Sequence, residues 1–244
     1  MPAAQPLLDL PVPVKESSHW RVTIRPEIFN AQRIPTLPDC WKIIESCAVS
    51  LRGWDYPHVD RTGRANGTDW ISSWCDFRGH REYWRFFQSG QFVHLFSFRE
   101  DAIPNALATA VGKIRPEIPT LGLQPSGCID ITELLYNVTE IYEFSSRLAQ
   151  KTAIAGSLSI AIELVNVKSR ILTALAPSRA WWGYHPTVEA DLAHSREIAV
   201  EQLMGWSAEL ALEAAIWFFH RFQWNDPNLP TLQNDQRKLL TRSL

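Results

Sequence analysis

The sequence predicts an α+β fold in which mixed or antiparallel sheets are covered by helices. Segments that alternate apolar and polar residues, typical of half-buried strands, occur before residue 100 and again after residue 157. Segments with apolar residues at helical spacing lie between and after them. With 244 residues and 45% hydrophobic content, the chain is long enough to bury a sizeable core. Strands and helices grouped in this way indicate the α+β class.

We expect a single α+β domain over residues 19–244, preceded by an extended N-terminal arm over residues 1–18. The arm carries several prolines, which interrupt helices. Further prolines occur between residues 102 and 127. This connection is either a boundary between two sub-lobes or a long loop over one continuous core, and both interpretations stay open.

The first strand is predicted at residues 19–26, HWRVTIRP. Its alternation places Trp20, Val22 and Ile24 on one face. A short helix is predicted from Asp39 to about Ser50, with Asp39 capping its start.

The region from Val49 to Phe98 is predicted to be mainly β-structure and is rich in aromatic residues. TDWISSWCDF, residues 68–77, and QFVHLFSF, residues 91–98, both alternate as strands do. In the second of these segments, one side carries Phe92, His94, Phe96 and Phe98. Ser89-Gly90 indicates a turn before it. Whether Glu82–Gln88 is a strand or a short helix is left open.

The most clearly defined element is a helix over about residues 130–150. Asp130 and Glu133 match a capping box, in which each side chain bonds the backbone N–H of the other residue. In the same helix, Glu140 and Glu143 are expected on a solvated face, and Glu143 is placed to pair with Arg147 four residues later.

Three more strands are predicted in one sheet, at SLSIAIELV, KSRILTAL and REIAVEQLM, which are residues 157–165, 168–175 and 196–204. A helix from about Gly205 to Trp224 follows, with Trp206 expected on its packing stripe. After NDPNLP, a final helix is predicted over Thr231–Arg242.

Charge and motifs argue against several classes of protein. The formal net charge of −2 gives no field that would draw the chain onto nucleic acid or an anionic membrane. No apolar run is long enough to span a membrane, and the N-terminus lacks the pattern of a secretory signal. The four cysteines form no C-x-x-C pair, so reduced buried thiols are expected. Since P-loop, dinucleotide-binding and α/β-hydrolase motifs are absent too, we expect a cytoplasmic protein with no cofactor and no membrane association.

Tryptophan is unusually frequent, with 11 residues. Aromatic and arginine side chains are typical of binding interfaces. The first hypothesis is therefore a non-enzymatic subunit that holds a protein partner, a second copy of itself or a ligand through an aromatic and arginine-rich surface. The residues of this surface are Arg52, Trp54, Arg78, Arg81, Trp84 and Arg85, with Trp181 and Trp182 from a later loop. Neighbouring acids balance these arginines, so nucleic acid is the weaker candidate partner.

The second hypothesis is a metal-dependent hydrolase that acts on nucleic acid. Asp55 and His58 belong to a D-x-x-H-x-D motif, and Asp76 and His80 belong to a D-x-x-x-H-x-E motif that ends at Glu82. Carboxylates and imidazoles are ligands that divalent metal ions accept. If the motifs meet, the metal ligands would be Asp55, His58, Asp76 and His80. In the alternative interpretation the carboxylates accept hydrogen bonds from nearby arginines.

Four stretches carry a resemblance to a known group of proteins: LRGWDYPHVD, EYWRFFQSGQFVHLF, LLYNVTEIYEFSSRLA and ELALEAAIWFFHRFQW. Over about residues 19–240, the chain resembles the domain that follows a Schlafen-type, AlbA-like DNA-binding module in some bacterial proteins. The module itself is not recognised in this sequence. The resemblance implies an accessory or sensing domain in a bacterial defence or regulatory assembly, and it assigns no catalytic residues.

Overall fold

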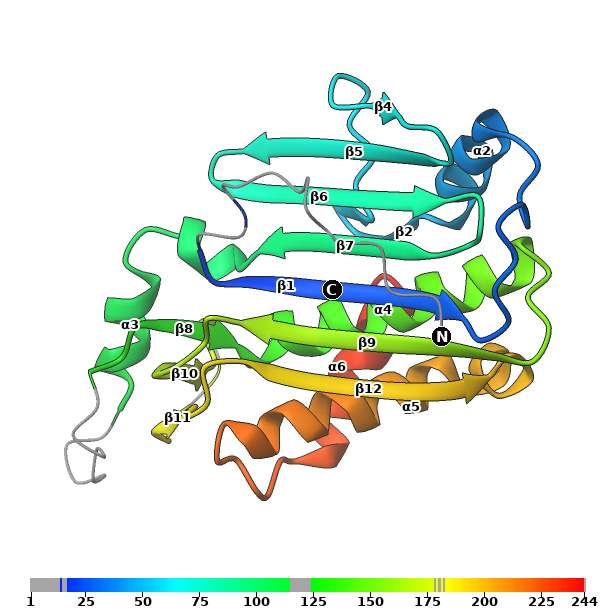
Figure 1. Cartoon of the computed structure of the whole chain (residues 1–244). Coiled ribbons are helices and arrows are strands. Elements are labelled where there is room, and N and C mark those ends of the chain that lie inside the picture. Colours follow the sequence, from blue (N-terminus) through cyan, green and yellow to red (C-terminus); the bar gives the residue numbers. More distant parts are fainter. Residues whose placement is uncertain are drawn as a thin grey trace.

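The computed structural model describes residues 14, 17–114, 124–177, 179, 181 and 183–243. These residues form one large sheet with helices packed against one face, together with two smaller sheets (Figure 1). The α+β class expected from the sequence is confirmed.

All neighbouring strands of the large sheet are antiparallel. Their order is β12-β9-β1-β7-β6-β5-β4. The bounds are β1 (His19–Pro26), β4 (Ala65–Asn66), β5 (Trp70–Phe77), β6 (His80–Phe87), β7 (Phe92–Ser97), β9 (Ser157–Val165) and β12 (Leu192–Ala199). β1 pairs with β7 on one side and with β9 on the other. Strands from both sides of the 102–127 connection therefore share one sheet.

Two smaller sheets complete the β-structure of the described residues. One contains β8 (Gly127–Asp130), β10 (Arg170–Thr173) and β11 (His185–Pro186), and the other pairs β2 (Val49–Arg52) with β3 (Trp54–Tyr56). The prediction that KSRILTAL joins the sheet of β9 is wrong, because β10 pairs in parallel with β8. REIAVEQLM is a strand only in its first half. Val200 and Leu203 are buried three positions apart, which is a helical spacing, and a helix begins at Val200.

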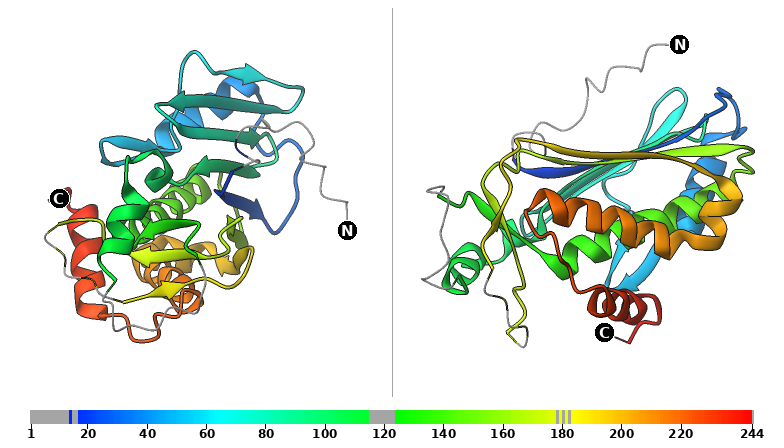
Figure 2. Two further views of the ribbon diagram at one scale, coloured as in Figure 1. Left: turned by 90° about the vertical axis from the view of Figure 1, so that its left-hand side faces the viewer. Right: turned by 90° about the horizontal axis from the view of Figure 1, so that it is seen from below.

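The main helices lie on the same side of the large sheet (Figure 2). They are α2 (Leu37–Cys47), α4 (Ile131–Lys151), α5 (Val200–Arg221) and α6 (Leu229–Leu240). A short 3-10 helix, η1 (Arg99–Ala102), and α3 (Ala106–Gly112) follow β7. No helix in the described part of the chain has both the length and the apolar character that crossing a membrane requires.

The start of α4 matches the capping prediction in one half only. The Asp130 side chain accepts hydrogen bonds from the backbone N–H groups of Thr132 and Glu133, as an N-cap does. The Asp130 N–H, however, donates to Oε1 of Glu100 at 2.7 Å rather than to Glu133. The side chain of Glu133 is thereby left for other contacts.

α2 begins two residues earlier than expected. Its N-cap is Thr36, whose side chain accepts from the Asp39 N–H at 3.2 Å and whose hydroxyl donates to the Asp39 carboxylate at 2.6 Å. Pro38 is compatible with this start, because the first helical turn has no partner for the N–H group that proline lacks.

α5 is kinked, with a non-helical backbone at Trp206. The side chain of Trp206 is 61% exposed, so its predicted place on the packing stripe is wrong. Leu210, Ala214 and Phe218 of that stripe are buried as expected. The helices predicted near residues 130–150 and 231–242 are present as α4 and α6.

The main core lies between the large sheet and the helices. Trp20, Val22 and Ile24 are fully buried there, as their alternation predicts. A smaller cluster on the other face of the sheet joins Val14, Tyr83 and Leu95. β6 shows that the segment whose conformation the sequence left open is a strand.

The four cysteines are free and buried, as expected. Cys40 and Cys47 lie in α2, Cys75 in β5 and Cys128 in β8. Burial raises the pKa of the thiols of Cys40, Cys75 and Cys128 to about 12.

Candidate ligand-binding pocket

A cavity of about 400 Å³ is lined by residues of β2, β3, β5, β6, β7, η1 and α4. Its aromatic lining consists of Trp54, Tyr56, Phe77 and Phe96. Its ionisable lining consists of Arg52, Asp55, His80, Glu82, His94, Arg99, Glu133 and Glu140. Gly53, Ser97 and Asn137 complete it. The volume lies within the range of small-molecule sites.

The side chains of Arg52 and Trp54 point in different directions because the chain bends at Gly53 between them. Gly53 has a φ of +64°, a left-handed conformation that glycine adopts at little cost. The side chain of Arg52 contacts α4, whereas the indole N–H of Trp54 donates to Glu82 of β6. β2 and β3 thus supply one wall of the cavity.

Strand alternation supplies the opposite wall. His80 and Glu82 of β6 point to the helix-facing side of the sheet, as do His94 and Phe96 of β7. Glu82 lies directly across from Phe96 in the β6–β7 pair. Charged and aromatic groups therefore alternate along the wall that faces α4.

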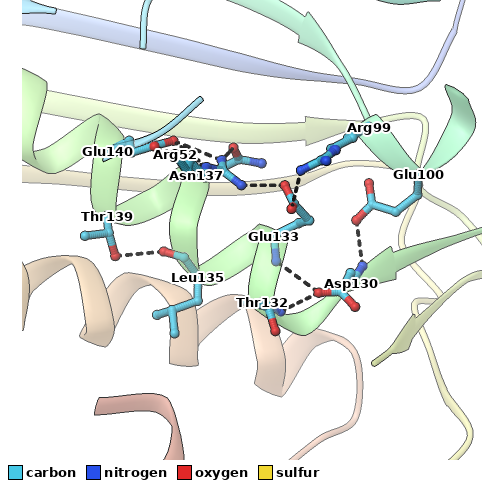
Figure 3. A network of polar contacts seen from close by, with 10 residues as sticks. All are labelled: Arg52, Arg99, Glu100, Asp130, Thr132, Glu133, Leu135, Asn137, Thr139 and Glu140. Atoms are coloured by element: carbon cyan, nitrogen blue, oxygen red, sulfur yellow. Dashed lines mark hydrogen bonds and ion pairs between the residues drawn. The ribbon is translucent and has the colours of Figure 1, made fainter. Parts of the chain in front are cut away.

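Arg52 joins β2 to three side chains of α4 (Figure 3). Its guanidinium donates to Glu133 at 2.5 Å, to Asn137 at 2.5 Å and to Glu140 at 2.9 Å. Arg99 donates to the other oxygen of Glu133 at 2.8 Å. Burial alone would lower the pKa of Arg52, but the charges of Glu140 and Glu133 raise it above its ordinary value. Arg52 is a fixed cation with little capacity for further ligands.

Glu140 corrects the prediction of a solvated helix face. Its side chain is 2% exposed and receives Arg52, while burial raises its pKa against the opposing effect of Arg52. Glu143 does pair with Arg147 at 3.0 Å, as predicted. The two glutamates differ in their partners: Arg52 of β2 reaches Glu140, whereas Glu143 pairs with Arg147 within α4.

Glu82 is a buried carboxylate in the lining of the cavity. It accepts from the Trp54 indole at 2.9 Å and from the His58 backbone N–H at 2.7 Å. Nε2 of His94 lies 3.0 Å away, and Nε2 of His80 lies 3.5 Å away. Burial alone would raise the pKa of Glu82, but the charge of His94 and the hydrogen bonds from both histidines hold it well below its usual range.

Three buried polar atoms of lining residues have neither a hydrogen bond nor an ion-pair contact among the described residues. They are Oη of Tyr56, Nδ1 of His80 and Nδ1 of His94. Burial, followed by the charges of Glu82 and Glu140, raises the pKa of Tyr56 well above its ordinary value, so its hydroxyl stays protonated. Buried polar groups in proteins nearly always have a partner, and one that lacks it calls for an explanation.

Two residues of the predicted aromatic and arginine-rich surface, Arg52 and Trp54, line this cavity. A third, Trp84, is fully buried in the main core. Its indole N–H donates to the His58 carbonyl at 2.6 Å, and its ring meets Trp41 edge-on. Trp84 therefore does not present its ring to a partner, because its position on β6 turns it toward the helices.

The other arginines of the predicted surface lie outside the cavity lining. Arg78 lies over the Phe77 ring at 5.5 Å. Arg81 pairs with Asp76 at 3.0 Å, which agrees with the alternative interpretation that these carboxylates accept hydrogen bonds from nearby arginines. The guanidinium of Arg85 lies 4.0 Å from the centre of the Trp70 ring.

The described residues of the later loop do not line the cavity. Trp181 is half-buried, donates to the Leu172 carbonyl at 3.1 Å and meets Trp224 edge-on. Trp182 lies outside the described residues.

The four candidate metal ligands are only partly brought together. His58 stacks on Trp54 with ring centres 4.1 Å apart, and His80 meets the same indole edge-on at 5.2 Å. Asp55 accepts from Ser50 at 2.5 Å, whereas Asp76 pairs with Arg81. Within the described ranges, no three histidine, cysteine, aspartate or glutamate side chains lie where they could hold a metal ion.

Sequence reasoning missed several residues of the cavity. Glu133, Asn137 and Glu140 stand at positions i, i+4 and i+7 of α4, a spacing that predicts one shared face. His94 alternates with three phenylalanines, a pattern that marks it as a buried imidazole. No local pattern identifies Arg99, because its contact with Glu133 joins distant segments.

Comparison of the chain with protein-family models, with curated proteins and with solved structures gives no match. The geometry of the cavity is therefore the basis of the function proposed next.

Proposed function

We propose that the protein is a non-enzymatic sensing or interaction subunit that binds a small ligand in the cavity between β3, β6, β7 and α4. The observation that carries this proposal is the cavity of about 400 Å³ itself, whose lining combines four aromatic side chains with buried polar and charged groups.

The composition of the lining supports binding. Small-molecule sites combine apolar and aromatic walls with a few convergent polar groups. Four aromatic side chains form the walls: Trp54, Tyr56, Phe77 and Phe96. Buried polar groups meet beside them.

The state of the charged groups supports a non-enzymatic role. Glu82 already receives two hydrogen bonds and lies within 3.5 Å of two imidazoles, so its oxygens have little room for a substrate proton. Arg52 is shared among Glu133, Asn137 and Glu140. Groups held in this way fix the shape of a site rather than exchange protons.

The proposal includes a protein partner or a second copy of this chain. Arg78 and Arg81 of the aromatic and arginine-rich surface lie outside the cavity and stay accessible. The resemblance described above extends the proposal to a bacterial defence or regulatory assembly. Free buried thiols support a reducing compartment such as the cytoplasm. Loss of a copurifying partner or of self-association in Arg78→Ala would support this part, and an unchanged assembly would count against it.

Ligand-observed NMR with a library of small fragments tests the pocket. Phe77 is 55% exposed and lines the cavity, so Phe77→Ala removes a wall with little effect on folding. Phe29, which is 60% exposed and outside the lining, provides the matched control Phe29→Ala. We expect fragments that bind the native protein and the control but bind Phe77→Ala at least about fivefold more weakly, the loss of roughly 1 kcal/mol. If no fragment distinguishes the two variants, the pocket does not bind ligands.

A further inference from the structure

We propose that residues 7–13, LLDLPVP, bind to the outer face of the large sheet, which is the face turned away from α4 and α5. These residues precede Val14, with which the described part of the chain begins. The inference goes beyond the proposed function, and none of the sheet residues that carry it lines the cavity.

A row of apolar side chains crosses the outer face. In the strand register, Trp74 of β5 lies opposite Tyr83 of β6, and Tyr83 lies opposite Leu95 of β7. Their neighbours in sequence, Trp84 and Phe96, belong to the core on the helix-facing side. Because successive residues of a strand point to opposite faces, the row lies on the outer face. The helices α4 and α5 lie on the other side of the sheet (Figure 2).

Val14 anchors the chain on this row. Its side chain is fully buried in one cluster with Tyr83 and Leu95, and Trp74 packs against that cluster. β1 begins only five residues later, at His19. The chain that precedes Val14 therefore starts on the outer face, beside β6 and β7.

Apolar surface is available beside this anchor. Trp70 and Trp74 of β5 are four residues apart, so both indoles stand on the outer face, and both are half-buried. Arg85 lies with its guanidinium 4.0 Å from the centre of the Trp70 ring and donates to the Tyr83 hydroxyl at 3.0 Å. Aromatic rings that are half-buried gain free energy from further apolar cover.

Residues 7–13 have the composition of a segment that binds such a surface. Leu7, Leu8, Leu10 and Val12 are aliphatic, and Asp9 is the single charged residue. Burial of aliphatic side chains is the main favourable contribution to apolar association. The two prolines of the segment restrict its backbone, which lowers the conformational entropy that binding costs.

The occupant of the surface is the segment of the same chain. Seven residues reach at most about 25 Å from Val14, which spans several strands at a spacing of about 4.8 Å. The short tether keeps the segment at a high effective concentration beside the surface. Docking within one chain therefore has an advantage over binding a segment from another molecule.

Protection from an endoproteinase that cleaves before aspartate tests the proposal. Cleavage between Leu8 and Asp9 of the full chain releases residues 1–8, and intact mass spectrometry measures its initial rate. A synthetic peptide of residues 1–18 provides the rate for an unbound segment. Cleavage of a docked segment follows the fraction of time that it is released. We expect cleavage of the native chain to be at least about tenfold slower than cleavage of the peptide.

Two variants remove the docking from opposite sides. Trp74→Ala takes an indole from the surface, and Val14→Asp places a charge at the anchor without changing the sheet. Both should be cleaved at least about fivefold faster than the native chain. Trp206→Ala is the matched control, because Trp206 is 61% exposed on α5, which lies on the other side of the sheet. It should be cleaved at the native rate.

Three results would overturn the proposal: cleavage of the native chain at the rate of the peptide, native rates for both Trp74→Ala and Val14→Asp, or protection that is lost on dilution. The last result would mean that the segment binds a second copy of the chain. Circular dichroism checks the fold of Trp74→Ala, and if this variant does not fold, Val14→Asp decides. Since Trp74 lies outside the cavity lining, failure here leaves the proposed pocket intact, and failure of the pocket leaves this proposal intact.

Discussion

Glu82 shows how one buried carboxylate organises a site. Four donors or imidazoles from β3, the segment after it, β6 and β7 meet at its two oxygens. A buried acid surrounded in this way is stable as the anion. The orientation of Trp54 and the position of the segment at His58 both depend on it.

Glu82→Gln should therefore destabilise the protein strongly. The amide replaces one acceptor oxygen by a donor that faces donors, and breaking a buried charge contact typically costs about 3–5 kcal/mol. The urea midpoint at neutral pH measures this cost. Asp76→Asn is the control, because the exposed pair of Asp76 with Arg81 should contribute no more than about 1 kcal/mol. Similar midpoints for the two variants would contradict the role given to Glu82.

Because the pKa of Glu82 is depressed, its contribution has a defined pH dependence. The stabilisation is present above the ordinary pKa of 4.5 and is lost as the pH falls toward the lower value of the folded state. The difference between native protein and Glu82→Gln should shrink in acid.

The contribution of Glu100 to stability should depend on pH in the opposite direction to that of Glu82. Burial, with smaller effects from the charges of Glu133 and Asp130, raises its pKa from 4.5 to about 8, against the opposing hydrogen bond from the Asp130 N–H. Between these values the folded state keeps a proton that the unfolded state has lost, so stability falls as the pH rises. Between pH 5 and pH 8, the urea midpoint of Glu100→Gln should change less than that of the native protein. Parallel profiles would show that Glu100 ionises normally.

At the scale of elements, the residue that caps α4 also holds the chain just beyond β10. The Asp130 side chain caps α4 and also accepts from the Leu175 N–H at 2.5 Å, just beyond β10. The Asn228 side chain caps α6 but accepts only from Thr231 among the contacts described for it.

Asp130→Ala should therefore lower the free energy of unfolding more than Asn228→Ala does. An N-cap alone is worth about 0.5–2 kcal/mol, which is the expected loss for Asn228→Ala. Asp130→Ala should exceed it by about 1 kcal/mol or more, since the partly buried N–H of Leu175 loses its partner as well. Guanidinium midpoints of the two variants provide the comparison. Equal losses would mean that the contact with Leu175 adds nothing.

The sequence predicts where helices and strands lie better than it predicts which other elements they contact. The alternation of β1 and the apolar spacing of α4 are local, and both were identified correctly. β10 was assigned to the wrong sheet because strand pairing depends on distant segments, here β8. The same limit applies to the cavity: the motifs around His58 and His80 contain three of its lining residues, but Glu140 needed the position of Arg52 to be recognised as buried.

For the molecule as a whole, the interior position of β1 in the large sheet has a thermodynamic consequence. β1 hydrogen-bonds to β7 from the first half of the chain and to β9 from the second. Neither half can lose its part of the sheet without exposing an edge of the other.

We therefore expect one cooperative unfolding transition for the whole domain. Far-ultraviolet circular dichroism and tryptophan fluorescence should give the same midpoint, and calorimetric and van 't Hoff enthalpies should agree. Two transitions separated in temperature would instead support sub-lobes divided near residues 102–127.

The buried cysteines can report local opening of the fold through their reaction with an alkylating reagent. Because burial raises the pKa of the thiols of Cys40, Cys75 and Cys128 to about 12, an alkylating reagent meets almost no thiolate in the native protein. Each modification would record a moment when α2, β5 or β8 had opened. Mass spectrometry of briefly labelled chains would thus time the local opening of three separate parts of the molecule without any introduced probe.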